Sequence, residues 1–528
     1  MPHASRRNAG ADRSGLRQTT VSGPLPLLLP DIAWPLHDAA GSRAIEAMSA
    51  ASLPPHTLMQ RAGLATAKLA LALAPHAQTF WIAAGPGNNG GDGLEAAMHL
   101  QRAGKQVRVS LFGDPARQPV DAALSRARAQ EAGVSIGSGM PSATHADVAV
   151  DALLGLGLTK APEGDLAAAI DRINSLTALR LAVDLPSGLD GDTGVSHGGA
   201  VANATHTLSL LSLKPGLFTA QGRDAAGAIW FDDLGTATVA AAQVPRAWLG
   251  SAAAAWQFEQ PRRHAQHKGS FGDVIVVGGT VNMAGAAILA GRAALAAGAG
   301  RVYVSVLDPD APTLDSAWPE LMLEPRLWRD RRAVTAATVV CGCGGGDAVR
   351  EVLPQVLAHA PRLALDADAL NAIAVDSALQ RQLMTRARTG QATVLTPHPL
   401  EAARLAGLPD AAAVQRSRLS VAEQLAAQFG CVVILKGSGS VIAAPGRVSV
   451  INPSGNARLA SAGTGDVLAG WLGGIWTTSQ AHPQPPSAAL VAQAAAWTHG
   501  LGADAGPGRR QPHGLTASGL IQRLAALN

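Results

Sequence analysis

Hydrophobic positions in the first half of the chain fall into short runs separated by longer amphipathic segments. The apolar runs at 79–84, 106–111, 147–151 and 179–183 predict buried strands. Apolar residues at helical spacing over 43–74 and 94–103 predict helices. Strands that alternate with helices are typical of a parallel sheet, so this half is predicted to be an α/β domain.

The second half repeats this pattern. Strands are predicted at 273–277, 301–306, 338–341, 362–365, 393–396 and 432–436, and a small-residue helix at 284–298. A tight turn at Pro445-Gly446 makes 441–451 a predicted hairpin. We therefore expect a second α/β domain. The predicted division is a disordered tail at 1–30, a first domain at 31–235, a linker at 236–261 and a second domain at 262–528.

Composition limits the function classes. The 528 residues are 47% hydrophobic and 15% charged, with a formal net charge of +4, which gives no support for nucleic-acid binding. Three cysteines exclude a disulfide scaffold and fit a reducing cytoplasm. No apolar run reaches the roughly 18 residues that a membrane span needs. The tail carries several arginines without the apolar core of a signal peptide, and a transit peptide is the second interpretation.

Polar residues follow three predicted strands of the first half. A glycine loop at 85–93 carries Asn88, Asn89 and Asp92, and two later strands end at Asp151 and Asp184. The carboxyl ends of parallel strands form one crevice, so these groups are expected to converge. The loop is neither a GxGxxG fingerprint nor a P-loop. Its oxygen-rich side chains suit a hard cation or a ribose-phosphate ligand, whereas an ordinary Asn/Gly turn is the alternative.

The motifs Asn88–Gly93, Val150–Gly155 and Asp184–Gly188 resemble those of the NAD(P)H-hydrate epimerase domain, over about residues 36–235. The resemblance implies a Rossmann-like fold and interconversion of the R and S forms of hydrated NADH and NADPH. It implies hydrate binding by Asn88, Asn89, Gly90, Gly91, Asp92, Gly155, Leu156, Gly157, Leu158, Thr159, Lys160, Ala161 and Asp184. It implies a potassium ion held by Asn89, Asp151 and Ser187. Asp184 is the predicted acid/base group. Lys214 also matches a family position, although its simplest interpretation is a surface or structural lysine.

Polar residues also follow the strands of the second half. They lie at Asp366–Asp368, Thr396–Glu401 and Lys436–Ser440, and the turn Ala462–Asp466 opens an apolar helix. The first turn of a helix has free N–H groups and a favourable dipole for an anion. Asp466 there either handles a proton or a metal, or merely caps the helix. The alternatives without a catalytic role are helix capping by Asp366 and Asp368, a core histidine at 398 and a solvated lysine at 436. Cys341-Gly342-Cys343 without a second Cys/His pair is a poor zinc site.

This ordered set, with Lys268–Gly272, resembles ADP-dependent NAD(P)H-hydrate dehydratase of the ribokinase-like superfamily, over about residues 262–526. The resemblance implies that Asp466 is the catalytic base and, with Ala286, Gly344 and His398, contacts the hydrate. It implies nucleotide binding by Lys436, Gly437, Ser438, Gly439, Ser440 and Gly465. Segment 341–346 departs from the family pattern, which leaves its exact substrate contacts open. Segment 279–286 has fewer serines and glycines than the family, but Ala286 still falls at the substrate-contact position. Magnesium is implied by the polyphosphate of ADP.

The predicted protein is a bifunctional repair enzyme for NADH and NADPH hydrates. It epimerises the hydrates and dehydrates the S form with ADP, releasing AMP and phosphate. We also expect a cytoplasmic homo-oligomer that binds neither nucleic acid nor a membrane. One alternative is a kinase of a sugar or vitamin precursor with the same Gly-x-Gly-Asp turn. Another is a first half that only binds ligands or serves as a scaffold.

Overall fold

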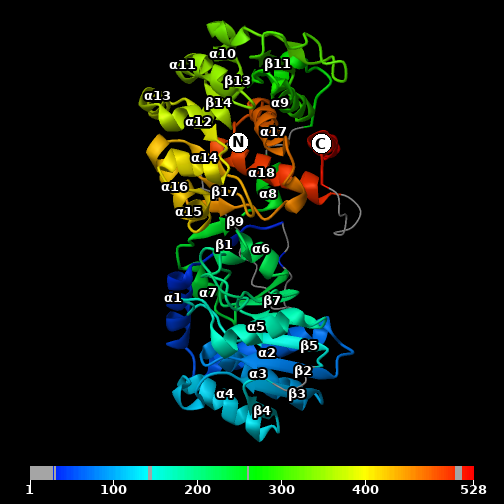
Figure 1. Cartoon of the computed structure of the whole chain (residues 1–528), viewed down its shortest axis with the longest axis vertical. Coiled ribbons are helices and arrows are strands. Elements are labelled where there is room, and N and C mark those ends of the chain that lie inside the picture. Colours follow the sequence, from blue (N-terminus) through cyan, green and yellow to red (C-terminus); the bar gives the residue numbers. More distant parts are fainter. Residues whose placement is uncertain (1–27, 29–30, 141–144, 258–260, 506–513, 528) are drawn as a thin grey trace, which may run out of the picture.

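The computed structural model describes residue 28 and residues 31–140, 145–257, 261–505 and 514–527. Two α/β units lie one above the other along the long axis of the molecule, the N-terminal unit below the C-terminal one (Figure 1). The predicted tail at 1–30 lies almost entirely outside the described residues. Among the helices that the structure describes, none is long and apolar enough to cross a membrane.

The lower unit is built on a seven-stranded sheet whose neighbouring strands are all parallel. Its order is β4 (Ser135–Ser138), β3 (Gln106–Leu111), β2 (Thr79–Ala84), β5 (Val148–Ala152), β6 (Leu179–Val183), β7 (His206–Leu210) and β8 (Ala228–Asp232). The helices of this unit are α1 (Ala39–Ala50), α2 (Thr57–Leu73), α3 (Asn88–Arg102), α4 (Val120–Glu131), α5 (Gly164–Ser175), α6 (Gly222–Ala225) and α7 (Ala237–Ala241). The chain leaves β2 toward β3 and returns on the other side as β5, so a ligand crevice is expected between the carboxyl ends of β2 and β5.

The upper unit contains an eleven-stranded mixed sheet. Its order is β1 (Trp34–Leu36), β9 (Ala247–Leu249), β18 (Ser449–Ile451), β17 (Val441–Ala443), β16 (Val432–Leu435), β15 (Ala392–Leu395), β14 (Arg362–Leu365), β13 (Thr338–Cys341), β10 (Asp273–Gly278), β11 (Arg301–Val306) and β12 (Met322–Leu323). Strands β16 to β12 run parallel, and β17 and β18 form the predicted hairpin.

Helices cover both faces of the upper sheet. They are α8 (Ala252–Trp256), α9 (Ala284–Ala296), α10 (Arg331–Ala336), α11 (Val349–His359), α12 (Asp368–Val375), α13 (Ser377–Arg388), α14 (Pro399–Ala406), α15 (Ala411–Gln415), α16 (Arg418–Phe429), α17 (Thr464–Ser479), α18 (Ala488–Asp504) and α19 (Ala517–Ala525). In β10, Ile275 and Val277 pack with the α11 and α16 side, whereas Val274 and Val276 pack with α9 and α17. A strand buried on both faces reads as a continuous apolar run, which is why this strand was visible in the sequence.

The two units share a sheet edge. Strand β1 lies at the start of the lower unit but pairs antiparallel with β9, and β9 pairs with β18 of the upper unit. Arg246, just before β9, forms a bidentate ion pair with Glu423 of α16, with N–O distances of 2.6 and 2.8 Å. The segment 236–261 therefore contributes a strand and two short helices to the junction.

Two element predictions need correction. The helical pattern over 43–74 is two helices, because Pro54 and Pro55 fall between α1 and α2. The predicted loop at 85–93 ends at Gly87, and Asn88 begins α3, so the glycines that suggested a loop form the first turns of a helix. Gly91 in this helix packs between α2 and α4, where an added Cβ would lie 2.6 Å from the Met59 sulfur and 2.9 Å from the Ala122 Cα, so a larger residue would push these helices apart.

Two candidate active sites

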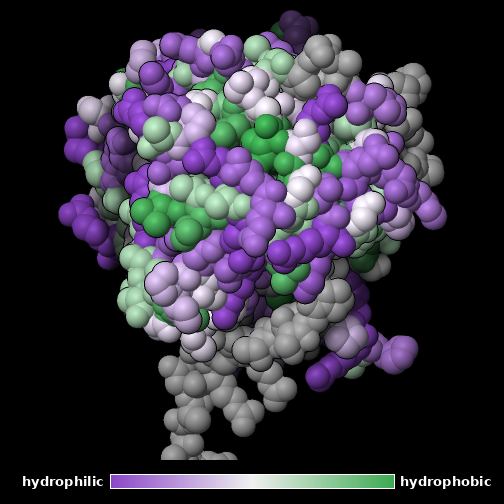
Figure 2. Space-filling model, turned by 90° about the horizontal axis from the view of Figure 1, so that it is seen from below, coloured by the Kyte–Doolittle hydropathy of each residue, from purple (hydrophilic) through white to green (hydrophobic). Residues whose placement is uncertain are grey.

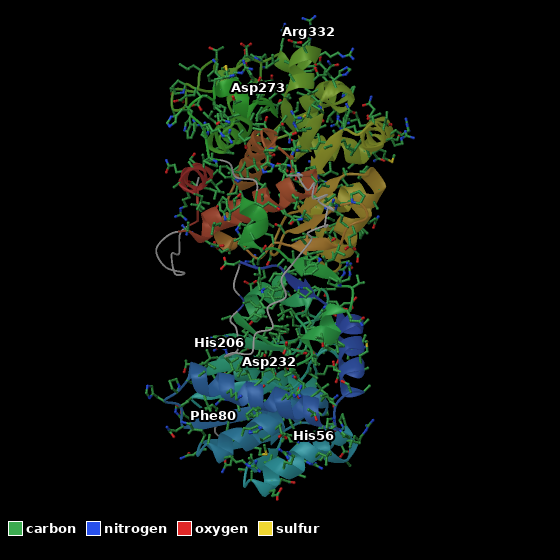
Figure 3. The ribbon with its side chains drawn as sticks, turned by 180° about the vertical axis from the view of Figure 1, so that it is seen from behind. His56, Phe80, His206, Asp232, Asp273 and Arg332 are labelled. Atoms are coloured by element: carbon green, nitrogen blue, oxygen red, sulfur yellow. The ribbon has the colours of Figure 1, made fainter. Side chains whose placement is uncertain are left out.

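A cavity of about 600 Å³ opens at the carboxyl ends of β2 and β5. Its walls come from the α1–α2 connection, the start of α3, the segment after β5 and the ends of β6 and β7. The lining includes the predicted residues Asn88, Asn89, Asp92, Asp184 and the segment Gly155–Leu158. His56, which also lines it, lies in the lower unit in Figure 3, on the side near α4. The crevice expected from strand order is therefore present, and it collects most of the predicted side chains.

The three predicted potassium ligands lie close together around Leu154, although only Asn89 of the three lines the cavity. The Ser187 hydroxyl donates to Asp151 Oδ1 at 2.5 Å, and the Ser187 N–H donates to Asp151 Oδ2 at 2.8 Å. Asn89 Nδ2 donates to the Leu154 carbonyl at 3.0 Å. Asn89 Oδ1 is buried and accepts no hydrogen bond from the residues that the structure describes. Burial raises the pKa of Asp151 to about 6, against the hydrogen bonds from Ser187. A buried carboxylate and an orphaned amide oxygen fit a hard cation.

Asp184 sits directly after β6 with φ +67°, a left-handed conformation that is uncommon for a residue with a side chain. Its carboxylate accepts hydrogen bonds from the Leu210 N–H and from the ammonium group of Lys214. Only 1% of the Lys214 side chain is exposed. The interpretation of Lys214 as a surface lysine is therefore wrong, because Lys214 is a buried partner of the predicted acid/base group.

Two further carboxyl groups face this ion pair. Burial raises the pKa of Asp92, and the negative charge of Asp184 adds to the rise. The same two causes raise the pKa of Glu46, a residue of α1 that also lines the cavity. Sequence reasoning missed Glu46, since one glutamate on an amphipathic helix gives no signal of its own. Because their pKa values are raised, Asp92 and Glu46 can hold a proton beside the Asp184–Lys214 pair. A proton held near the substrate is the requirement of acid/base chemistry.

Other predicted residues of this domain lie outside the lining. Gly90 and Gly91 face inward, where Gly90 packs on the Gly85 backbone and Gly91 on Met59. Thr159 and Lys160 are exposed beyond Leu158, and Ala161 packs near Gly199. These positions are structural neighbours of the cavity rather than part of its wall.

In the upper unit, Asp466 lies in the first turn of α17, which begins at Thr464 after Gly463 with φ +85°. Among the described residues, no backbone N–H of this helix donates to the Asp466 side chain at hydrogen-bond distance. Burial raises the pKa of Asp466 to about 6, and repulsion from Asp366 contributes. A carboxylate with a pKa near neutrality can accept a proton from a substrate hydroxyl at physiological pH.

Asp366, at the end of β14, anchors the neighbouring polar groups. Its Oδ1 accepts hydrogen bonds from Lys436 Nζ at 2.6 Å and from the Thr396 hydroxyl at 2.7 Å. Burial tends to lower the pKa of Lys436, but the Asp366 carboxylate raises it overall, so the lysine stays charged. The Cys343 sulfur and one carboxylate oxygen each from Asp366 and Asp466 lie within 4.8 Å of one another. Burial raises the pKa of Cys343, which keeps its thiol neutral.

The remaining predicted contacts surround this cluster. A Cβ added to Gly344 would lie 2.8 Å from the Ala286 Cβ, so these two positions are neighbours although 58 residues of sequence separate them. His398 caps α14 by accepting from the Leu400 N–H at 3.1 Å, and its Nε2 lies 3.1 Å from Glu401 Oε1. Its side chain is 46% exposed, so the alternative of a core histidine is wrong.

The predicted nucleotide residues form two groups. A Cβ added to Gly465 would lie 3.4 Å from Lys436 Nζ, which places the start of α17 beside the lysine. Gly437 to Ser440 form the turn between β16 and β17. The backbone of Ser438 and Gly439 contacts residues 218–220 of the lower unit. The molecule is thus a two-site α/β enzyme, with an acid–lysine cavity in one unit and a carboxylate–lysine cluster at a helix N-terminus in the other.

Comparison with known proteins identifies these units. Residues 274–525 match the family described as NAD(P)H-hydrate dehydratase, and residues 55–216 match the family described as YjeF-related protein N-terminus. The chain is 36% identical over 507 residues to a bifunctional NAD(P)H-hydrate repair enzyme of Escherichia coli, covering 94% of each chain. It is 33% identical over 548 residues to such an enzyme of Leishmania braziliensis, covering 96% of this chain and 95% of the relative.

A solved structure of an ADP/ATP-dependent NAD(P)H-hydrate dehydratase from Bacillus subtilis, crystallised with ATP and Mg²⁺, is 27% identical. It covers 51% of this chain and 93% of its own, with a TM-score of 0.41. On the extent and identity of the full-length matches, the chain belongs to the family of bifunctional NAD(P)H-hydrate repair enzymes. The resemblance noted from the sequence motifs is confirmed, and the alternative of a small-alcohol kinase is not favoured.

Proposed function

We propose that the two sites act in sequence on hydrated NADH and NADPH. The lower site interconverts the R and S hydrates, and the upper site dehydrates the S form with ADP. The observation that carries the proposal for the upper site is Asp466, a carboxylate with a pKa of about 6 beside Lys436 and a helix N-terminus. This arrangement combines a base with an anion site, as phosphoryl transfer to an alcohol requires.

In the upper site, Asp466 accepts the proton of the ring hydroxyl of the hydrate. The hydroxyl oxygen then attacks the terminal phosphate of ADP, and AMP leaves. The phosphorylated hydrate loses inorganic phosphate together with a ring proton, which restores the dihydronicotinamide. Lys436 and the N–H groups at the start of α17 stabilise the charge of the transferred phosphate. His398, Ala286 and Gly344 contact the hydrate, and residues 436–440 with Gly465 hold the nucleotide.

Magnesium fits this site through the carboxylate of Asp366 together with the phosphate oxygens. Mg²⁺ is commonly bound by one or two carboxylates plus substrate phosphates. Asp366 Oδ2, which accepts only a long contact of 3.9 Å from the Cys343 thiol among the described residues, is the carboxylate oxygen that meets this need. When bound, the ion neutralises the charge of the polyphosphate. The neutral, buried Cys343 thiol does not suit a hard cation.

In the lower site, Asp184 exchanges a proton at the epimerising carbon, and Lys214 positions the Asp184 carboxyl group through a hydrogen bond. The cluster of Asn89, Asp151 and Ser187 fits a potassium ion, because it supplies a carboxylate, a hydroxyl and an orphaned amide oxygen. Such an ion would hold the start of α3 and the segment after β5 in place around the substrate.

The proposed epimerase domain spans about residues 31–235 and the proposed dehydratase domain about residues 262–528, and residues 236–261 connect them. We also propose a location in the cytoplasm, which the three free cysteines support, and a homo-oligomer. Neither statement is needed for the chemistry of the two sites.

The test is to incubate the purified protein with mixed hydrate isomers, with and without ADP, while following the absorbance of restored NADH. Full recovery with ADP requires both activities, and recovery of only the S fraction means that the lower site is inactive. No recovery with ADP, or a phosphorylated hydrate that accumulates, contradicts the proposal for the upper site.

A further inference from the structure

We propose that residues 218–220 of the lower unit position the nucleotide loop of the upper unit, through Thr219 and the buried Arg418. The inference rests on the proposed function, in which the loop at 436–440 binds ADP. It makes the dehydratase site dependent on a segment of the epimerase unit. Thr219 and Arg418 are positioning residues, since both act through the loop.

Contacts across the junction hold the tip of the loop. The Ser438 carbonyl accepts hydrogen bonds from the Ala220 N–H at 3.1 Å and from the Thr219 hydroxyl at 3.2 Å. The Ser438 hydroxyl donates to the Ala220 carbonyl at 2.8 Å. A Cβ added to Gly439 would lie 2.0 Å from the Phe218 carbonyl oxygen, so only glycine permits this approach. The tip of the loop therefore packs closely against residues 218–220 of the lower unit.

Arg418, the first residue of α16, lies beneath the loop and is only 2% exposed. Its Nε donates to the Thr219 hydroxyl at 3.0 Å. Its Nη2 lies 3.2 Å from each of three backbone carbonyls, that of Leu435 at the end of β16 and those of Lys436 and Gly439 in the loop. Its Nη1 donates to Gln415 Oε1 at 2.8 Å. Burial lowers the pKa of Arg418 to about 10, so the guanidinium remains charged at neutral pH.

This cation orients the peptides of the loop. A trans peptide holds its N–H antiparallel to its C=O, and the described chain contains no cis peptide bond. Carbonyls of Lys436 and Gly439 that face the guanidinium therefore direct the N–H groups of Gly437 and Ser440 to the opposite side. On that side the donors can meet an anionic nucleotide, while the carbonyls that would repel it are kept away.

Thr219 links the guanidinium to the loop tip, because one hydroxyl accepts from Arg418 and donates to Ser438. The same stretch of chain begins at Lys214, the buried partner of Asp184, and continues through the short helical turn Pro215–Phe218. The position of this stretch is thus fixed by the lower site, and the stretch in turn holds the loop at 436–440 through the contacts of Thr219.

The experiment measures KM for ADP and kcat of dehydration in the full-length Thr219→Val variant, which keeps the side-chain shape but removes the hydroxyl. Losing a hydrogen bond to a buried charged group should raise KM for ADP about tenfold with little change in kcat. Thr219→Ser should restore the wild-type KM, because it retains the hydroxyl. The epimerase rate should be unchanged in both variants.

Thr207→Val is the matched control, because Thr207 is also fully buried in the lower unit and its hydroxyl donates only within that unit, to the Ala226 carbonyl. Its KM for ADP should equal that of the wild type. Arg418→Lys is the second variant, since an ammonium group keeps the charge but cannot serve the three carbonyls and Thr219 together. It should also raise KM for ADP, and this holds even where Thr219→Val fails to fold.

Lys436→Ala separates this inference from the proposed function. If Lys436→Ala binds ADP as well as the wild type does, the nucleotide site itself is misplaced. If Lys436→Ala loses ADP while Thr219→Val and Arg418→Lys keep the wild-type KM, the nucleotide site stands and the positioning role is overturned. An equal rise in KM in Thr207→Val would also overturn the role, because the effect would then be general destabilisation.

Discussion

Replacing Asp466 with asparagine distinguishes a catalytic base from a helix cap, because a buried base predicts a gain in stability with a loss of dehydration, whereas a cap predicts little change in stability. The pKa of Asp466 lies at about 6 instead of its ordinary 3.8, because burial and Asp366 disfavour its charge. A raised folded-state pKa means that the folded state loses stability as pH rises from the ordinary value through about 6. This difference corresponds to at most about 3 kcal/mol above pH 7.

Asp466→Asn removes that cost at neutral pH. Because Asp466 is partly exposed, we expect the variant to gain about 1–3 kcal/mol in free energy of unfolding. For a domain of this size the gain raises Tm by about 3–10 °C. At pH 4 the wild-type carboxyl is largely protonated, so the gain should shrink. Dehydration should fall at least about 100-fold, because a general base is lost, while ADP binding persists.

The assay combines thermal unfolding at pH 8 and pH 4, calorimetric titration with ADP, and the rate of NADH recovery. If Asp466 instead caps α17, asparagine should keep most of the stability, and Asp466→Ala should lose about 1 kcal/mol. A variant that dehydrates at the wild-type rate, or that is less stable than the wild type at pH 8, would refute the reasoning.

Three further outcomes follow from the same contacts. The kcat of dehydration should fall as pH drops through about 6, because protonated Asp466 cannot accept a proton; a rate that stays flat down to pH 5 contradicts this. Lys214→Met should abolish epimerisation and cost roughly 3–5 kcal/mol, because it leaves the Asp184 carboxylate without its cation. Lys68→Met at an exposed position is the control, and retained epimerisation in Lys214→Met would count against the role. Asn89→Ala should raise the K⁺ concentration needed for half-maximal epimerisation, measured against Na⁺ as the control ion, with dehydration unchanged.

The acidic residues at the carboxyl ends of strands were the part of the two sites that the sequence predicted well. Asp151 lies near the end of β5, and Asp184 and Asp366 directly follow β6 and β14. In each of the two sheets, parallel strands bring such ends to the same edge. The apolar runs were visible because strands covered by helices on both faces leave no polar alternation. The division into two α/β units was predictable for the same reason.

Features that depend on distant contacts were not predictable. Strand β9 has three residues, and its partner β1 lies more than 200 residues earlier, so neither leaves a periodic signal. The buried environment of Lys214 exists only because Asp184 and the Leu210 carbonyl converge on its ammonium group. The start of α3 at Asn88 was hidden by glycines, whose presence reflects close packing rather than a turn: Gly90 packs on the Gly85 backbone, Gly91 on Met59 of α2, and Gly93 on Ala152 of β5.

These distant contacts also bear on how the two activities are joined. Strand β1 completes a sheet of the upper unit, and Arg223 of the lower unit donates to the carbonyls of Pro453 and Gly455 at 2.9 and 2.6 Å. Both contacts lie on the side of the upper unit that carries the hairpin after the nucleotide loop. A flexible tether between two independent enzymes would need none of them, since loose linkage alone brings the sites into proximity. Sheet pairing, buried hydrogen bonds and glycine-limited packing fix the junction, so the lower unit is part of the structural support of the upper site.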